Sequence, residues 1–108
     1  MDTQESDVFH AIADPTRRAI LDRLRDGGQA VNEIAGRFEV SRPAISKHLR
    51  VLHNARLVTE VREGRNRIYR LNPDPLRELD RWLDEYRRFW SVSLLNLKKH
   101  VEAKGRKS

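Results

Sequence analysis

Residues 41–71 read SRPAISKHLRVLHNARLVTEVREGRNRIYRL, and this run predicts a helix followed by a β-hairpin. A helix over residues 41–55 is indicated because its first residue, a serine, can cap the amino end. Pro43 falls in the first turn, where a missing N–H is tolerated. Three apolar residues recur at helical spacing and would face a core: Ile45, Leu49 and Leu52. Residues 57–71 then predict two strands joined by the Gly-Arg-Asn tip at residues 64–66.

Shorter helices are predicted before this run and one long helix after it. Apolar spacing favours helices over residues 6–13, 14–26 and 31–38, the last without a capping side chain at its start. A turn of about three residues separates the last of these from the helix over residues 41–55, which is the helix-turn-helix pattern. An Asp-Pro pair starts the long helix over residues 74–103.

The 108 residues are expected to form one domain with one hydrophobic core. Residues 1–104 would make up this domain and residues 105–108 a disordered polar tail. The expected fold class is mainly α with a β-hairpin, a dimeric winged helix-turn-helix of five helices. No apolar run approaches the roughly 18 residues of a membrane-spanning helix, and no signal-peptide pattern occurs at the start. A cytoplasmic setting without a membrane partner is therefore expected.

The positive charge of the chain is concentrated in the predicted helix and hairpin. The formal net charge is +6. Residues 41–70 hold eight Lys or Arg residues and two acidic residues, so this segment alone carries +6 and the rest of the chain balances. A helix with polar side chains beside a basic hairpin is typical of proteins that hold duplex DNA, whose phosphates attract such a surface. The alternative is a basic surface that serves solubility alone.

The chain resembles the ArsR-type winged helix-turn-helix transcriptional regulators over roughly residues 8–95. The matching motifs are ADPTRRAIL at 13–21, VNEIA at 31–35, SRPAISKHLRVL at 41–52, Leu57-Val58 and EGR at 63–65. The resemblance implies a homodimeric repressor of double-stranded DNA, bound at a near-palindromic operator and, by family analogy, controlling its own promoter region. It also implies that the first and last helices form the dimer interface.

The residues expected to contact DNA come from the recognition helix, the hairpin tip and the start of the second helix: Arg42, Pro43, Ser46, Lys47, His48, Arg50, Arg62, Arg65, Asn66, Arg67, Thr16 and Arg17. A recognition helix presents its amino-terminal residues to base edges, so Arg42, Ser46 and Lys47 are expected there, and Arg50 at a base or a phosphate. The hairpin tip would reach the DNA backbone or the minor groove, and the amino end of the second helix would bind a phosphate. The alternative at each position is an ordinary solvated residue, or for His48 buried packing.

A stripe of apolar and aromatic residues follows the predicted helix over residues 74–103 at steps of three and four. About 30 residues would extend roughly 45 Å, farther than a domain of this size can cover at both ends. A second copy of the chain would cover the stripe, so a two-fold dimer is expected. The expected interface residues lie on this helix and the first helix: Val8, Phe9, Leu79, Trp82, Leu83, Tyr86, Phe89, Trp90, Leu94 and Leu97. The alternative is an effector pocket lined by the aromatic residues.

No cofactor, metal or catalytic activity is expected. His48 and His53 lie about 140° apart around a helix and cannot share a metal from one face. Metal-sensing members of the resembled family carry cysteines on the third helix, where Ala30 and Asn32 stand here. No nucleophile elbow, phosphate loop, dinucleotide fingerprint or metalloprotease motif occurs. The alternative function is a nucleic-acid or protein-interaction module regulated by a partner protein, and the pattern identifies no effector.

Overall fold

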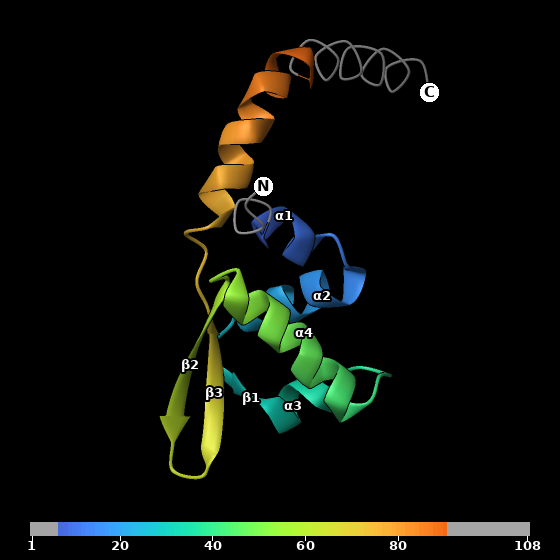
Figure 1. The fold of residues 1–108 in the computed structure, drawn as a ribbon, viewed down its shortest axis with the longest axis vertical. Helices are drawn as coiled ribbons and strands as arrows, with labels where there is room; N and C mark the ends of the chain where they lie inside the picture. Colours follow the sequence, from blue (N-terminus) through green and yellow to red (C-terminus); the bar gives the residue numbers. More distant parts are fainter. Residues whose placement is uncertain (1–6, 91–108) are drawn as a thin grey trace, which may run out of the picture. The chain divides into compact units, whose positions relative to one another are not determined.

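The computed structural model describes residues 7–90, and Figure 1 shows how their helices and strands are arranged. The elements follow in this order: α1 (Asp7–Ile12), α2 (Pro15–Leu24), β1 (Gln29–Ala30), α3 (Val31–Ala35), α4 (Arg42–Asn54), β2 (Val58–Glu63) and β3 (Asn66–Leu71). Residues 76–90 form a fifth helix. Five helices and a three-stranded sheet within the described residues confirm the predicted mainly α fold with a β-hairpin.

The chain divides into two compact units, one that ends at Arg77 and one that begins at Glu78. The second unit is helical over its described part, residues 78–90. The helix predicted over residues 74–103 begins at residue 76, two residues later than expected, and its portion beyond residue 90 lies outside the described residues. None of the helices found between residues 7 and 90 has both the length and the hydropathy that a membrane span requires.

The core of the first unit is built around α4, which contacts α1, α2, α3 and β2. Its predicted inward stripe is buried, because Ile45, Leu49 and Leu52 are 0%, 1% and 0% exposed. Side chains from the neighbouring elements complete the core: Val8, Ala11, Ile20, Leu21, Leu24, Ile34, Leu57 and Val58. Figure 1 shows the hairpin of β2 and β3 beside α4. The orientation of α4 about its own axis is thus fixed by three apolar side chains.

Helix starts are fixed by side chains that accept backbone hydrogen bonds. Asp14 and Ser41, the caps predicted for α2 and α4, accept from N–H groups three residues further on, at 3.0 and 3.2 Å. Helix α3 has no capping side chain in front of it, as predicted from the sequence. The Glu33 carboxylate instead reaches back and accepts from the N–H of Ala30 at 2.8 Å, which is half of a capping box.

The predicted extent of α3 is wrong at its carboxyl end. The helix ends at Ala35 rather than at residue 38, so residues 36–41 form a longer connection to α4 than the predicted three-residue turn. Phe38 packs against the core all the same. Its helical spacing from the residues before it therefore reflects burial of a turn residue, which periodicity alone does not separate from a helix.

The strands form an antiparallel sheet in the order β1-β3-β2. Glu63 pairs directly with Asn66, which leaves a two-residue tip of Gly64 and Arg65 instead of the predicted three-residue tip. Gly64 has a φ of 63°. Two-residue hairpins require a positive φ at this first central position, and glycine adopts it without strain.

Strand β1 is not predicted by the sequence, because two residues give no periodic signal. It pairs with β3, with Gln29 opposite Tyr69. The backbone of Gly28 approaches β3 so closely that a Cβ there would lie 2.8 Å from Cγ2 of Ile68 and 2.9 Å from Cγ of Arg70. A glycine at this position therefore permits the contact between β1 and the hairpin.

We expect Gly28→Ala to destabilise the protein by about 1–3 kcal/mol, because the new methyl group overlaps two side chains that are anchored in β3. Thermal unfolding followed by circular dichroism measures the effect. Gly36→Ala is the matched control, since Gly36 has a φ of −67° and its added Cβ would come no closer than 3.4 Å to a neighbouring atom. Equal melting temperatures for the two variants would show that the side chains of β3 shift to accommodate the methyl group without loss of stability.

Candidate nucleic-acid interface

An open groove of about 560 Å³ lies between α4 and the hairpin of β2 and β3, residues 58–71, which we call the wing. It brings together six of the residues predicted to contact DNA, three from each element: Arg42, Ser46, Arg50, Arg65, Asn66 and Arg67. The three helix residues are spaced four apart and therefore share one side of α4. This recognition groove is the place where polar side chains of the helix and the wing meet.

Three other predicted residues are exposed but do not line the recognition groove. Pro43 and Lys47 each follow a groove residue by one position, so they lie about 100° further around α4. Both are exposed, as is Arg62 on β2. The helix therefore presents a continuous exposed arc that runs from the groove to Lys47, on the side away from its buried stripe.

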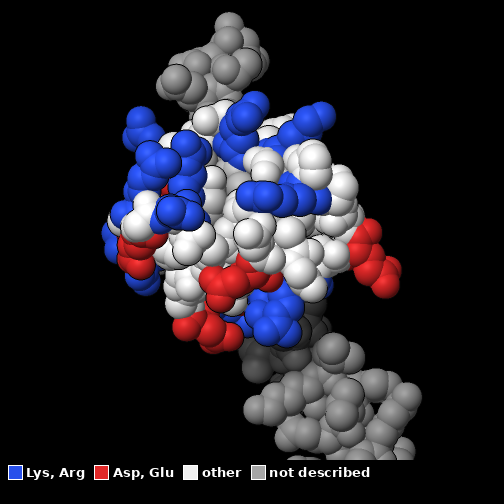
Figure 2. All heavy atoms as spheres, turned by 90° about the horizontal axis from the view of Figure 1, so that it is seen from below, with Lys and Arg blue, Asp and Glu red and all other residues white. Residues whose placement is uncertain are grey.

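The arginines around the recognition groove differ in their ion pairs. Within residues 7–90, four of them have no acidic side chain within salt-bridge distance: Arg42, Arg50, Arg62 and Arg65. Arg67 pairs with Glu60 at 3.1 Å, and Arg70 pairs with Glu63 at 3.8 Å. Figure 2 shows Lys and Arg side chains crowded on one part of the face that carries the wing tip. The unpaired cations are the ones that phosphates can reach without displacing a carboxylate.

The recognition groove also contains residues that the sequence analysis did not select as DNA contacts: Asn32, His53, Glu60 and Tyr69. Residues were selected off the apolar stripe of the recognition helix, at the hairpin tip and at the start of the second helix, so these four were passed over. His53 could have been found, because it lies three residues beyond Arg50 and so on the same side of α4. Burial raises the pKa of the Tyr69 phenol, and the Glu60 carboxylate opposite it adds to the shift. The Tyr69 hydroxyl therefore stays protonated and can donate a hydrogen bond.

The side chain of Arg17 caps the carboxyl end of α1. Its Nε donates to the carbonyl of Ala11 at 2.7 Å, and an Nη donates to the carbonyl of His10 at 3.0 Å. Arg18 donates to the carbonyl of Ile12 at 2.8 Å. The last carbonyls of a helix have no partner within it, so the two arginines satisfy groups that α1 cannot satisfy itself.

His48 lies with Arg17 where α4 meets α2, outside the recognition groove. Its Nδ1 is 3.3 Å from Arg17 Nη1 and 4.0 Å from an Asp14 carboxylate oxygen. The backbone N–H of Arg17 is the main cause that holds the pKa of Asp14 below its ordinary value, and His48 adds to the effect. Thr16 is half-buried in the same turn.

Among residues 7–90, no three His, Cys, Asp or Glu residues are placed to hold a metal ion.

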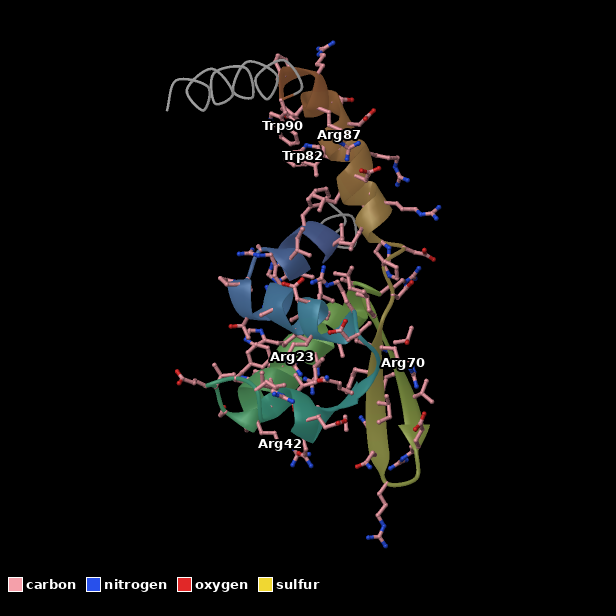
Figure 3. All side chains as sticks on the ribbon, turned by 180° about the vertical axis from the view of Figure 1, so that it is seen from behind. Arg23, Arg42, Arg70, Trp82, Arg87 and Trp90 are labelled. Atoms are coloured by element: carbon pink, nitrogen blue, oxygen red, sulfur yellow. The ribbon has the colours of Figure 1, made fainter. Side chains whose placement is uncertain are left out.

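The helix over residues 76–90 exposes four large aromatic side chains of the predicted interface: Trp82, Tyr86, Phe89 and Trp90. The ring centroids of Trp82 and Tyr86 lie 5.2 Å apart at an angle of 59°. Figure 3 shows Trp82 and Trp90 projecting to the same side of the helix. Leu79 and Leu83 are half-buried. This helix therefore carries a concentrated aromatic surface.

The interface residues predicted on α1 are placed differently. Val8 is 3% exposed and belongs to the core of the first unit, and Phe9 is half-buried against that core. Leu94 and Leu97 lie outside the described residues. Among the members of the predicted set that the structure describes, the aromatic side chains of residues 76–90 are thus the most exposed.

Comparison with known proteins places the chain among bacterial regulators. Residues 14–60 match the family model described as bacterial regulatory protein, arsR family. The HTH-type transcriptional regulator Rv2034 of Mycobacterium tuberculosis is 44% identical over 98 residues, which cover 91% of this chain and 89% of the relative. The transcriptional repressor SdpR of Bacillus subtilis is 41% identical over 78 residues, 72% of this chain and 87% of the relative.

Solved structures agree with these sequence relatives. An ArsR-like transcriptional regulator from Rhodococcus sp. RHA1 superposes with a TM-score of 0.68 at 35% identity, covering 90% of this chain and 92% of that chain. A possible transcriptional regulator for arsenical resistance superposes with a TM-score of 0.66 at 47% identity, covering 71% of this chain and 80% of that chain.

We expect Arg17→Ala to destabilise the fold by about 1–3 kcal/mol, because two α1 carbonyls lose a charged hydrogen-bond donor. The free energy of unfolding in urea measures this loss. Arg18→Ala removes one comparable bond from a more exposed side chain and serves as the milder control. Unchanged stability of the Arg17 variant, together with weaker DNA binding, would instead assign Arg17 to phosphate contact.

Proposed function

The chain belongs to the arsR family of bacterial regulatory proteins, and from this premise we propose that it is a homodimeric repressor that reads a near-palindromic DNA site. Family membership makes it a DNA-binding transcriptional regulator and not an enzyme. The dimer, the direction of regulation and the residues that touch DNA are the proposed parts.

The recognition groove is the observation that carries this proposal. Arginines from α4 and from the wing line one concave surface, and both arginines of α4, Arg42 and Arg50, have no acidic partner among the described residues. Figure 3 shows Arg42 near the end of the unit where the wing tip lies. Such a surface suits a helix that enters the major groove of DNA by its amino end. The wing beside it can then follow the DNA backbone.

Each part of the surface is assigned a distinct contact. Arg42, Ser46 and Lys47 lie in the first turns of α4, and we assign them to base edges, where arginine can bind guanine through two hydrogen bonds. Arg50 is assigned to a base or a phosphate. The wing arginines at 62 and 65 are assigned to the backbone or the minor groove, with Asn66 beside them, and Arg67, which pairs with Glu60, is assigned a weaker contact there. Pro43 would contact the DNA surface at the start of the helix.

The exposed aromatic residues of the helix over residues 76–90 support the homodimer. A second copy of the chain can bury Trp82, Phe89 and Trp90 together, which removes a large apolar surface from water. A two-fold dimer would place two α4 helices in successive major grooves, about 34 Å apart. The near-palindromic site follows from this symmetry.

Repression is proposed because SdpR, a relative with 41% identity, is named a transcriptional repressor. Control of the protein's own promoter is part of the proposal, as is action in the cytoplasm, where a bacterial chromosome lies. We assign no cysteine metal switch, since the positions that hold cysteine in metal-sensing members are Ala30, at the end of β1, and Asn32, in α3, here.

We expect Arg42→Ala and Arg65→Ala to weaken DNA binding in different ways. Loss of a bidentate base contact should lower the ratio of specific to random-duplex affinity by about 10-fold or more for Arg42→Ala. Loss of a phosphate contact should weaken both duplexes alike for Arg65→Ala and reduce the salt slope by about 0.9. Fluorescence anisotropy across a salt series, with a duplex selected from a random pool by the wild-type protein, distinguishes the two.

Arg25→Ala controls for the loss of one positive charge. Arg25 is exposed at the end of α2 and does not line the recognition groove. Equal effects of all three substitutions would mean that binding follows net charge alone, which contradicts the site assignment.

We expect Trp90→Ala to raise the dimer dissociation constant by at least about 10-fold, because a buried tryptophan is a common interface hot spot. Sedimentation velocity over a concentration series measures the change. Arg81→Ala, an exposed substitution on the same helix, should leave the constant within a factor of two or so. A wild-type protein that remains monomeric at high micromolar concentration would contradict the proposed dimer.

A further inference from the structure

Glu60 is the one acidic side chain among the described residues that line the recognition groove. Arginines 42, 50, 65 and 67 line the same groove. Selection for phosphate binding alone would not place a carboxylate among them, because it repels the phosphate that the arginines attract. The position of Glu60 therefore indicates a role other than phosphate binding.

The sheet register places Glu60 on the helix-facing side of the wing. Val58 pairs with Leu71 at the base of the hairpin, Glu60 with Tyr69, and Arg62 with Arg67. Residues two apart on a strand share a face, so Glu60 follows the buried Val58 on the side turned toward α4. Glu60 is only 26% exposed. The next residue, Val61, is exposed on the opposite side.

The carboxylate of Glu60 holds Arg67. The two side chains lie on diagonally adjacent positions of the ladder, and a carboxylate oxygen of Glu60 is 3.1 Å from Arg67 Nη1. Glu60 also pairs directly with Tyr69 across the ladder, and its charge contributes to the raised pKa of that phenol. Arg67, whose side chain is 61% exposed, is thus paired with a carboxylate at the groove, whereas Arg65 at the tip has no acidic partner within residues 7–90.

We propose that Glu60 is a specificity-determining residue that restrains Arg67 and disfavours phosphates in the recognition groove, so that sequence-independent DNA binding stays weak. The proposal rests on the DNA-binding function proposed above. A random duplex offers only its phosphates, and an unrestrained Arg67 would bind them as firmly as Arg65 does. A cognate site compensates for the restraint through base contacts to α4, so removal of the carboxylate changes the two kinds of binding unequally.

Glu60→Gln tests this proposal with little change in shape. A random-sequence duplex of about 30 base pairs is the non-specific probe, and a duplex selected from a random pool by the wild-type protein is the specific probe. We expect the affinity for the random duplex to rise roughly fivefold at 0.15 M salt, and the salt slope to steepen by about 0.9, which corresponds to one more phosphate contact. The ratio of specific to random-duplex affinity should fall.

Glu63→Gln is the matched control, because Glu63 lies on the same strand and pairs with Arg70 at 3.8 Å but does not line the groove. It makes the same change in net charge and should move the slope much less. In an Arg67→Gln background, Glu60→Gln should lose most of its effect, since the restrained group is absent. Circular dichroism of each variant confirms that the fold is retained.

Two outcomes overturn the proposal. Unchanged random-duplex affinity and slope in Glu60→Gln, with wild-type binding intact, would show that Glu60 restrains nothing. A loss of specific affinity with random-duplex binding unchanged would show that the carboxylate contacts a base, as an acceptor from cytosine can. Failure of the wild-type protein to enrich any duplex from the pool would instead contradict the proposed function itself.

Discussion

The burial of one stripe of α4 is the constraint on which the rest of the structure depends. Ile45, Leu49 and Leu52 are almost completely removed from water, and each such side chain contributes about 1.5–3 kcal/mol to stability. A rotation of α4 about its axis would expose at least one of them. The opposite arc of the helix is therefore held outward, and the side that bears Arg42, Ser46 and Arg50 is held toward the wing.

The wing depends on the same core. Its base is anchored by Val58, which is buried, and by Asn72, whose backbone N–H donates to Leu57 O and whose side chain donates to Arg56 O, both at 2.8 Å. Polarity then increases along the helix-facing side of the hairpin toward the tip. The wing can hold a fixed position beside α4 because its base belongs to the core, while its tip is free to be fully polar.

The elements marked by regularly spaced apolar residues or by a capping side chain could be predicted from the sequence. The spacing of Ile45, Leu49 and Leu52 and the caps at Asp14 and Ser41 were sufficient for α4 and α2. Features that depend on a single pairing were not predictable from spacing: the two-residue strand β1, and the tip, where pairing of Asn66 with Glu63 shortens the turn. Glu60 and Tyr69 were missed for a related reason, since only the register of the sheet turns them toward α4.

The ion pairs in the structure make the basic residues of segment 41–70 unequally available to phosphates. From sequence, its eight basic residues count equally toward phosphate binding. In the structure Arg67 and Arg70 are paired with carboxylates of the neighbouring strand, while within residues 7–90 Arg42 and Arg50 on α4 have no acidic partner. The wing therefore contributes less free charge than its composition suggests. In the proposed function, α4, which the core holds in place, reads the bases, and the wing, where Arg67 and Arg70 are paired with carboxylates, adjusts how strongly any duplex is held.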